Sequence, residues 1–143
     1  MHFFCLALRL FASGIVVVSA LHLFLGLGAE ALLGAAVPPA AYVEPSLDSQ
    51  NRFYGVSFAL YAGALYLCSR DLPRFEPLLK LTLIIFFLGG LARLVSWAAR
   101  GAPTFPIVVL ACSELLLPPL LWLWYARVRS AEPPDHVTGE LSD

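Results

Sequence analysis

Four long apolar segments dominate this sequence and limit what it can fold into. They cover residues 3–27, 50–68, 75–99 and 104–125. About 20 apolar residues in a helix cross the ~30 Å hydrocarbon core of a bilayer. Three of the segments reach that length alone, and the second reaches it if its helix begins near Asp48. We therefore expect an all-α integral membrane protein, with a four-helix bundle in residues 1–129.

The composition agrees with a membrane protein. Hydrophobic residues make up 59% of the chain and charged residues 13%, and the mean hydropathy is +0.79. A soluble domain carries about 25% charged residues. The net charge of −1 provides no basic surface for nucleic acid. The three cysteines lie in apolar segments without CxxC spacing, so we expect neither a disulfide framework nor a metal site, and no cofactor.

The first segment also has some features of a cleavable signal peptide, because Val18-Ser19-Ala20 resembles a cleavage site. However, Arg9 interrupts the segment instead of preceding it, and the apolar run continues to Leu27. We therefore interpret it as a membrane span.

The basic residues predict the orientation in the membrane. With four spans, both termini share one side, and six basic residues lie near it: Arg9, Arg70, Arg74, Lys80, Arg127 and Arg129. Three lie toward the other side: Arg52, Arg93 and Arg100. Cytoplasmic ends of spans are rich in Lys and Arg, so we expect both termini to lie on the cytoplasmic side. Residues 130–143 are acidic and lack aromatic residues, which predicts a disordered tail.

Short polar motifs suggest where the helices begin. We expect a short helix within residues 29–36 and a break at the prolines that follow. Ser46 or Asp48 would cap the second long helix, Asp71 with Pro73 would begin the third, and Thr104 with Pro106 would begin the fourth.

Glu114 is the most unusual residue, because it lies in the middle of an apolar segment. Placing a carboxylate there costs about 2–3 kcal/mol or more. Pro118 and Pro119 have no N–H to donate to the carbonyls one turn earlier, so we predict a helix break at this pair. Arg93 lies in the outer half of the third segment. Two roles for Arg93 and Glu114 remain open, namely a structural ion pair and a ligand-binding pair.

Polar residues gather in the outer half of all four segments, which predicts an outward-facing polar pocket. The candidate ligand-binding residues are Glu114, Arg93, His22, Asp48, Gln50, Asn51, Arg52, Tyr54, Tyr61 and Trp97. Alternatively, His22 is an interfacial histidine, and residues 48–52 form only a helix cap with solvated side chains.

Steps of three and four residues predict one inward stripe on each helix. The four stripes are Gly14, Val18, His22 and Gly26; Gln50, Tyr54, Ser57 and Tyr61; Phe86, Gly90, Arg93 and Trp97; and Ile107, Ala111, Glu114 and Pro118. Gly89 and Gly90 would let a neighbouring helix approach closely.

Three motifs carry a family resemblance. They are LDSQNRFYG at residues 47–55, FLGGLARLVSW at residues 87–97 and ELLLPP at residues 114–119. Together they resemble a bacterial family of small four-span membrane proteins, the domain of unknown function 4345. The resemblance runs from the first segment to Trp124 and leaves out the tail after Arg129. It implies a four-helix inner-membrane protein and implies no activity.

Three functions are compatible with this pattern. The favoured one is a non-enzymatic protein that binds or transports a small amphipathic ligand in the polar pocket. The second is an accessory subunit of a larger membrane complex. The third is a lipid-modifying enzyme with Glu114 and His22 as proton-transfer groups, although no nucleophile elbow, phosphate loop or metal-ligand spacing is present. Expected partners are the lipid bilayer, the ligand, a membrane protein or a second copy of the chain.

Overall fold

The computed structural model describes residues 1–130, and all regular structure in this range is helical. The helices are α1 His2–Leu25, α2 Leu27–Leu32, α3 Pro39–Tyr42, α4 Pro45–Arg70, α5 Leu72–Arg100 and α6 Phe105–Ser130. Three of them, α1, α5 and α6, are long and apolar enough to cross a membrane. α4 is equally long, but its first turns carry the polar residues 48–52. The tail prediction for residues 130–143 falls, beyond Ser130, outside the described residues.

The four apolar segments fall largely on the four long helices, and the caps explain where two of these helices begin. Asp71 accepts a hydrogen bond from the backbone of Arg74 at 3.1 Å, which confirms the predicted start of α5. The predicted cap of α4 is wrong. Glu44 caps that helix and accepts from the backbone N–H of Leu47 at 2.8 Å, which holds the pKa of Glu44 below its usual value. Pro45 favours this earlier start because its φ angle is already helical.

Two further details concern the short helix and the proline pair. The short helix expected within residues 29–36 begins and ends slightly earlier, as α2. The break predicted at Pro118 and Pro119 does not occur, because α6 continues through both prolines. Proline φ angles fit a helix, so the missing N–H groups remove two hydrogen bonds without ending it.

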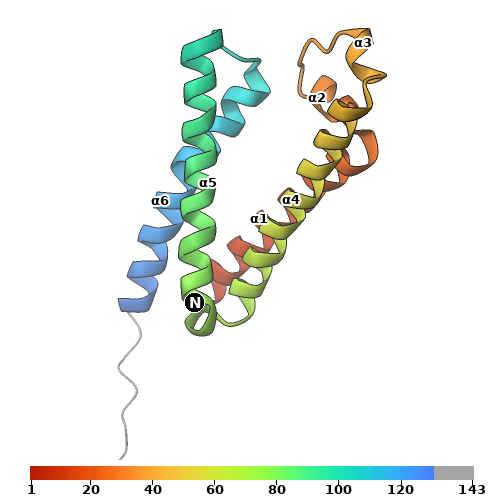
Figure 1. Ribbon diagram of the computed structural model, residues 1–143. Helices are drawn as coiled ribbons and strands as arrows, with labels where there is room; N and C mark the ends of the chain where they lie inside the picture. The colour runs from red at the N-terminus through yellow and green to blue at the C-terminus, as the bar shows by residue number, and fades with distance from the viewer. Residues whose placement is uncertain (131–143) are drawn as a thin grey trace, which may run out of the picture.

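The long helices form two antiparallel hairpins, α1 with α4 and α5 with α6 (Figure 1). The hairpins meet at the end that holds the N-terminus and the α4–α5 turn, and they diverge toward the other end. We call these the closed end and the open end. At the closed end, side chains from all four long helices form one apolar core: Phe4, Leu8, Ala12, Ile15, Ala62, Leu65, Cys68, Leu72, Leu79, Leu83, Leu121 and Tyr125.

Close backbone contact holds the α1–α4 hairpin together. Ser19 donates a 2.6 Å hydrogen bond to the carbonyl of Gly55. A Cβ atom on Gly55 would lie 2.7 Å from the backbone nitrogen of Leu23 and 2.8 Å from the carbonyl oxygen of Ser19. Glycine is therefore the residue that allows α1 and α4 to approach this closely.

An arginine from each helix contacts the C-terminal carbonyls of the other. Arg52 of α4 donates to the carbonyl of Leu23 at 2.7 Å, and Asp48 holds its guanidinium at 2.7 Å. Near the end of α4, Arg9 of α1 donates from Nη2 to the carbonyl of Ser69 at 3.5 Å and from Nε to its side-chain oxygen at 3.3 Å. Cations are favourable at helix C-termini, where carbonyls lack partners.

Candidate ligand-binding cleft

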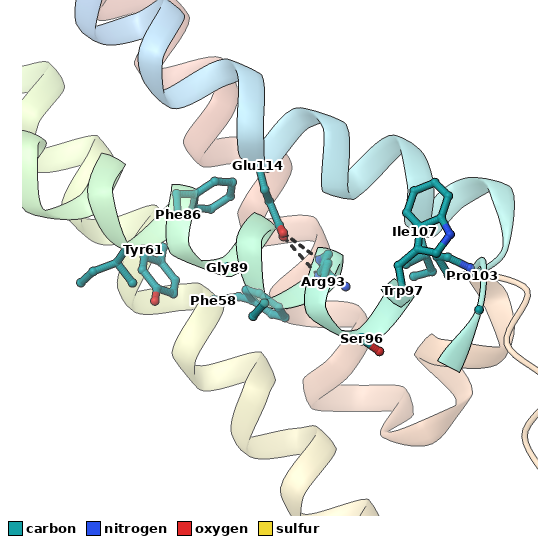
Figure 2. Close-up of a pocket in the computed structure, with 13 residues that line it drawn as sticks. Phe58, Tyr61, Phe86, Gly89, Arg93, Ser96, Trp97, Pro103, Ile107 and Glu114 are labelled. Carbon is teal, nitrogen blue, oxygen red and sulfur yellow. Dashed lines mark hydrogen bonds and ion pairs between the residues drawn. The ribbon is translucent and has the colours of Figure 1, made fainter. Parts of the chain in front are cut away.

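Two cavities lie between the hairpins. One, of about 420 Å³, is lined mainly by α5, with smaller contributions from α4, α6 and the loop before α6 (Figure 2). The other, of about 470 Å³, is lined by α1, α2, α4 and α6, together with Arg93 of α5. The cavities share Phe58, Arg93 and Ile107 in their walls, so they adjoin at Arg93. We call the two together the inter-hairpin cleft.

An ion pair forms one polar wall of this cleft. Arg93 Nε lies 2.7 Å from Glu114 Oε2, and Arg93 Nη2 lies 3.2 Å from Glu114 Oε1 (Figure 2). The Glu114 side chain is 8% exposed and that of Arg93 is 30% exposed. The carboxylate is thus enclosed between α5 and α6, while the guanidinium reaches the cleft. The structure shows that Arg93 and Glu114 pair directly.

Gly89 and Gly90 give Glu114 its place beside α5. A Cβ atom on Gly90 would lie 2.8 Å from Leu115 Cγ and 3.1 Å from Glu114 Cβ. A Cβ on Gly89 would meet Glu114 Oε2 at an ordinary 3.8 Å. The predicted close approach at this pair is therefore confirmed, and Gly90 is the residue that requires it.

A second polar cluster lies across the cleft on α1, α2 and α4. His22 Nδ1 lies 2.9 Å from the carbonyl of Val18, so this nitrogen carries a hydrogen, and Nε2 faces Glu30 at 3.5 Å. Asn51 also donates to Glu30, at 3.3 Å. The amide oxygen of Asn51 is buried and has no partner within residues 1–130.

Aromatic side chains form the apolar part of the cleft. Phe58 packs edge-on against His22 at 5.3 Å between ring centroids. Phe86 makes similar contacts with Phe11 at 5.3 Å and with Tyr61 at 6.0 Å. Figure 2 shows Tyr61, Phe58 and Phe86 around the ion pair. The cleft therefore has polar groups beside an apolar, aromatic surface.

A loop contact joins the two hairpins at the open end. Thr104, before α6, donates a 2.9 Å hydrogen bond to the carbonyl of Leu33, which follows α2. The hairpins are thus connected at the open end as well as at the closed end. α6 begins at Phe105, directly after Thr104, which confirms the start predicted from Thr104 and Pro106.

The predicted site residues divide into two groups. Those that line a cavity are Glu114, Arg93, His22, Tyr54, Tyr61 and Trp97. Asp48, Gln50, Asn51 and Arg52 line neither cavity. Arg52, paired with Asp48, instead donates to a carbonyl at the C-terminal end of α1. Asn51 donates a hydrogen bond to Glu30, and Gln50 is exposed.

Sequence reasoning missed Glu30 as a site residue. It lies between the first two apolar segments, within the short helix expected in residues 29–36. Its position is set by α2, which turns Glu30 back toward His22 and Asn51. The signal in the sequence was a single acidic residue within an otherwise apolar short helix.

A family model matches residues 3–125, which is most of the chain. The family is described as "Domain of unknown function (DUF4345)". This chain belongs to the DUF4345 family. No curated protein and no solved structure matches it.

Membership of the DUF4345 family confirms the resemblance found in the sequence. Two of the three motifs, at residues 87–97 and 114–119, meet at the Arg93–Glu114 ion pair. The third, at residues 47–55, holds α4 against α1. Within residues 1–130, no ion pair or hydrogen bond joins His22 to Glu114, and no cluster of three metal-binding side chains occurs. The cleft geometry therefore offers binding groups and does not join the two residues considered for proton transfer.

Proposed function

We propose that this DUF4345 protein crosses a bacterial inner membrane four times and binds a small amphipathic molecule in the inter-hairpin cleft. The four crossings rest on the path of the chain. α1, α5 and α6 are long and apolar, and α4 packs antiparallel along α1 before the chain enters α5. Once α1 crosses, α4 must return the chain to the first side. Large side chains such as Leu60 and Val95 are 72% and 70% exposed, as expected for contact with lipid.

The charges favour the closed end as the cytoplasmic end. Six basic side chains and two acidic ones, Asp71 and Glu76, belong to that end within residues 1–130. The open end has three basic and four acidic side chains, of which Glu114 is the most buried. An excess of Lys and Arg on one side favours the cytoplasm. The cleft would then open in the outer half of the membrane.

The contrast between polar and apolar walls carries the ligand proposal. On one side, Arg93 uses Nε and Nη2 for Glu114, and its Nη1 makes no hydrogen bond within residues 1–130. On the other side, the Oε2 atom of Glu30 has no donor in the same range. A polar headgroup can therefore find a donor and an acceptor, while an apolar tail can pack on Phe58 and Phe86.

In this proposal, Glu114 does not bind the ligand directly. Its carboxylate is occupied by Arg93, and its buried position fixes the guanidinium at the edge of the cleft. Arg93 is then the group that contacts the ligand, and Glu114 is a positioning residue. Binding is proposed without transport, because the apolar core joins the hairpins at the closed end.

Native mass spectrometry of the gently extracted protein tests the proposal. The informative variant is Ala92→Trp, because Ala92 lines the cleft and the indole would fill it without removing a charge. Ala98→Trp is the control, since it places the same side chain on the same helix at an exposed position outside both cavity walls. We expect the parent and Ala98→Trp to retain a small molecule that Ala92→Trp loses.

Two other outcomes would count against the proposal. If all three proteins retained the same small molecules, the cleft would not be the binding site. If all three retained a second polypeptide and no small molecule, the result would favour an accessory subunit instead.

A further inference from the structure

A second concave surface lies on the outside of the α5–α6 hairpin. This groove, of about 420 Å³, is lined by Lys80, Leu83, Ile84, Phe87, Pro118, Pro119 and Trp122. By helical spacing, Lys80, Ile84 and Phe87 occupy the face of α5 opposite to Arg93. The groove is therefore separate from the inter-hairpin cleft.

The groove is apolar except at one end. Ile84 is 57% exposed and Phe87 is 37% exposed, although both are large hydrophobic side chains. The short rings of Pro118 and Pro119 form its α6 side, where longer side chains would fill the space. From Lys80 to Phe87 the helix rises about 10 Å, which is the length of part of an acyl chain.

A cation and an indole lie together at the polar end. Lys80 Nζ is 5.0 Å from the centre of the Trp122 ring and 2.9 Å from Glu76 Oε1. Lysine beside tryptophan is typical of the boundary between hydrocarbon and headgroups. Glu76 does not neutralise this region, because its single negative charge is shared by two cations, Lys80 and Arg129.

The closed end as a whole is basic. Within residues 1–130 it has six basic side chains and two acidic ones, so the described part of this end is strongly positive. Basic pockets between helices near the cytoplasmic surface bind anionic lipid headgroups. The positive charge around the groove therefore favours lipids with an anionic headgroup.

We infer that the α5–α6 groove is a binding site for an anionic phospholipid. One acyl chain lies along Ile84 and Phe87 toward the two prolines, and the phosphate lies near Lys80 at the level of Trp122. This inference rests on the membrane insertion proposed above, but it does not depend on a ligand in the cleft. It assigns a specific lipid contact to the outer face of the α5–α6 hairpin.

Native mass spectrometry with defined lipids tests this inference. The purified full chain is mixed with equal amounts of phosphatidylglycerol and phosphatidylcholine, and the retained adducts are compared. Two variants probe the groove. Lys80→Gln removes the cation. Ile84→Trp fills the groove and keeps the charge of Lys80. Arg100→Gln is the charge-matched control at the open end, and Leu94→Trp is the size-matched control at another exposed position of α5.

We expect the parent and both controls to retain phosphatidylglycerol in preference to phosphatidylcholine. One basic group near a membrane surface changes lipid affinity about fivefold, so Lys80→Gln should lower the preference by about that factor. Ile84→Trp should lower total lipid retention. Equal retention of both lipids by the parent would overturn the inference. A preference unchanged in both groove variants would also overturn it, because the basic end as a whole would then attract the lipid.

The outcome is separable from that of the cleft experiment. Ala92→Trp should keep the phosphatidylglycerol preference while losing the cleft ligand. Failure of the cleft proposal would leave the lipid result intact, and failure of the groove would leave the cleft ligand in place.

Discussion

Arg93 and Glu114 form a two-point ion pair that ties α5 to α6 beside the inter-hairpin cleft, with contacts of 2.7 and 3.2 Å. The two partners differ in their surroundings. The Glu114 side chain is only 8% exposed, whereas the Arg93 side chain is 30% exposed and lines both cavities. Removing one partner should therefore have a different cost from removing the other.

We predict that Arg93→Gln destabilises the protein more than Glu114→Gln. The first leaves an enclosed carboxylate without its cation, at a cost of about 2–3 kcal/mol. The second leaves a guanidinium that water in the cleft can solvate. The double variant should recover part of the loss, because no unpaired charge remains. Thermal unfolding in detergent measures all four proteins. A larger loss for Glu114→Gln, or purely additive losses, would contradict the assignment.

The contact between α1 and α4 yields a second prediction. Gly55→Ala would place Cβ within 3 Å of backbone atoms on α1, and backbone cannot turn aside as a side chain can. We expect a destabilisation of about 1–3 kcal/mol, typical of overpacking. Gly63→Ala on the same helix is the control, because no atom lies within 4 Å of its Cβ position. That change should stabilise α4 by up to about 1 kcal/mol. Equal effects in an unfolding assay would refute the close contact.

The adjacent glycines of α5 provide a similar test. Gly90→Ala would force Leu115 and the Cβ of Glu114 away from α5, and it should cost about 1–2 kcal/mol. Gly89→Ala meets only an ordinary contact, so it should be neutral or slightly stabilising. Chemical unfolding of the two variants would decide. If Gly89→Ala were the more damaging, the packing of α6 on α5 would differ from the one described.

The polar motif at residues 47–55 is predicted to act on α1 and not on the ligand. Arg52→Gln removes the hydrogen bond to the carbonyl of Leu23, so amides in the last turn of α1 and in α2 should exchange faster. The side chain is 44% exposed, and the loss of global stability should stay below about 1 kcal/mol. Hydrogen exchange followed by mass spectrometry measures this, with Arg100→Gln as the control. Loss of the cleft ligand in Arg52→Gln would instead give this residue a direct binding role.

The sequence predicted the positions of the long helices better than it predicted which face of each helix is buried. Apolar length located the four long helices, and Asp71 located one helix start. The stripe Ile107, Ala111, Glu114 and Pro118 does face inward, since the last three are buried. The stripe predicted for α4 is only partly right, because Tyr54 and Tyr61 line the cleft but the stripe misses the face that packs on α1. The buried residues of α4 include Asn51, Gly55, Ala62 and Leu65, whereas Gln50 and Tyr54 are exposed.

The physical reason for this error lies in the two-hairpin arrangement. In a symmetric bundle each helix has one inward face that collects its polar residues. Here α4 packs one face on α1 through Gly55 and turns a second face, with Phe58 and Tyr61, to the cleft. Periodicity alone cannot separate two such faces in a helix surrounded by apolar material. The role of Glu30 was not predicted for a related reason. A helix of six residues is too short to show a periodic pattern of apolar residues.

Photo-crosslinking in the native membrane tests whether the inter-hairpin cleft binds a small amphipathic molecule. Benzoylphenylalanine replaces Phe58, which lines both cavities, and in a second protein it replaces Leu60, which is 72% exposed on the same helix. Mass spectrometry then identifies the adducts. We expect a defined small amphipathic molecule at position 58 and only bulk phospholipid at position 60. Identical phospholipid adducts at both positions would contradict the existence of a selective binding cleft.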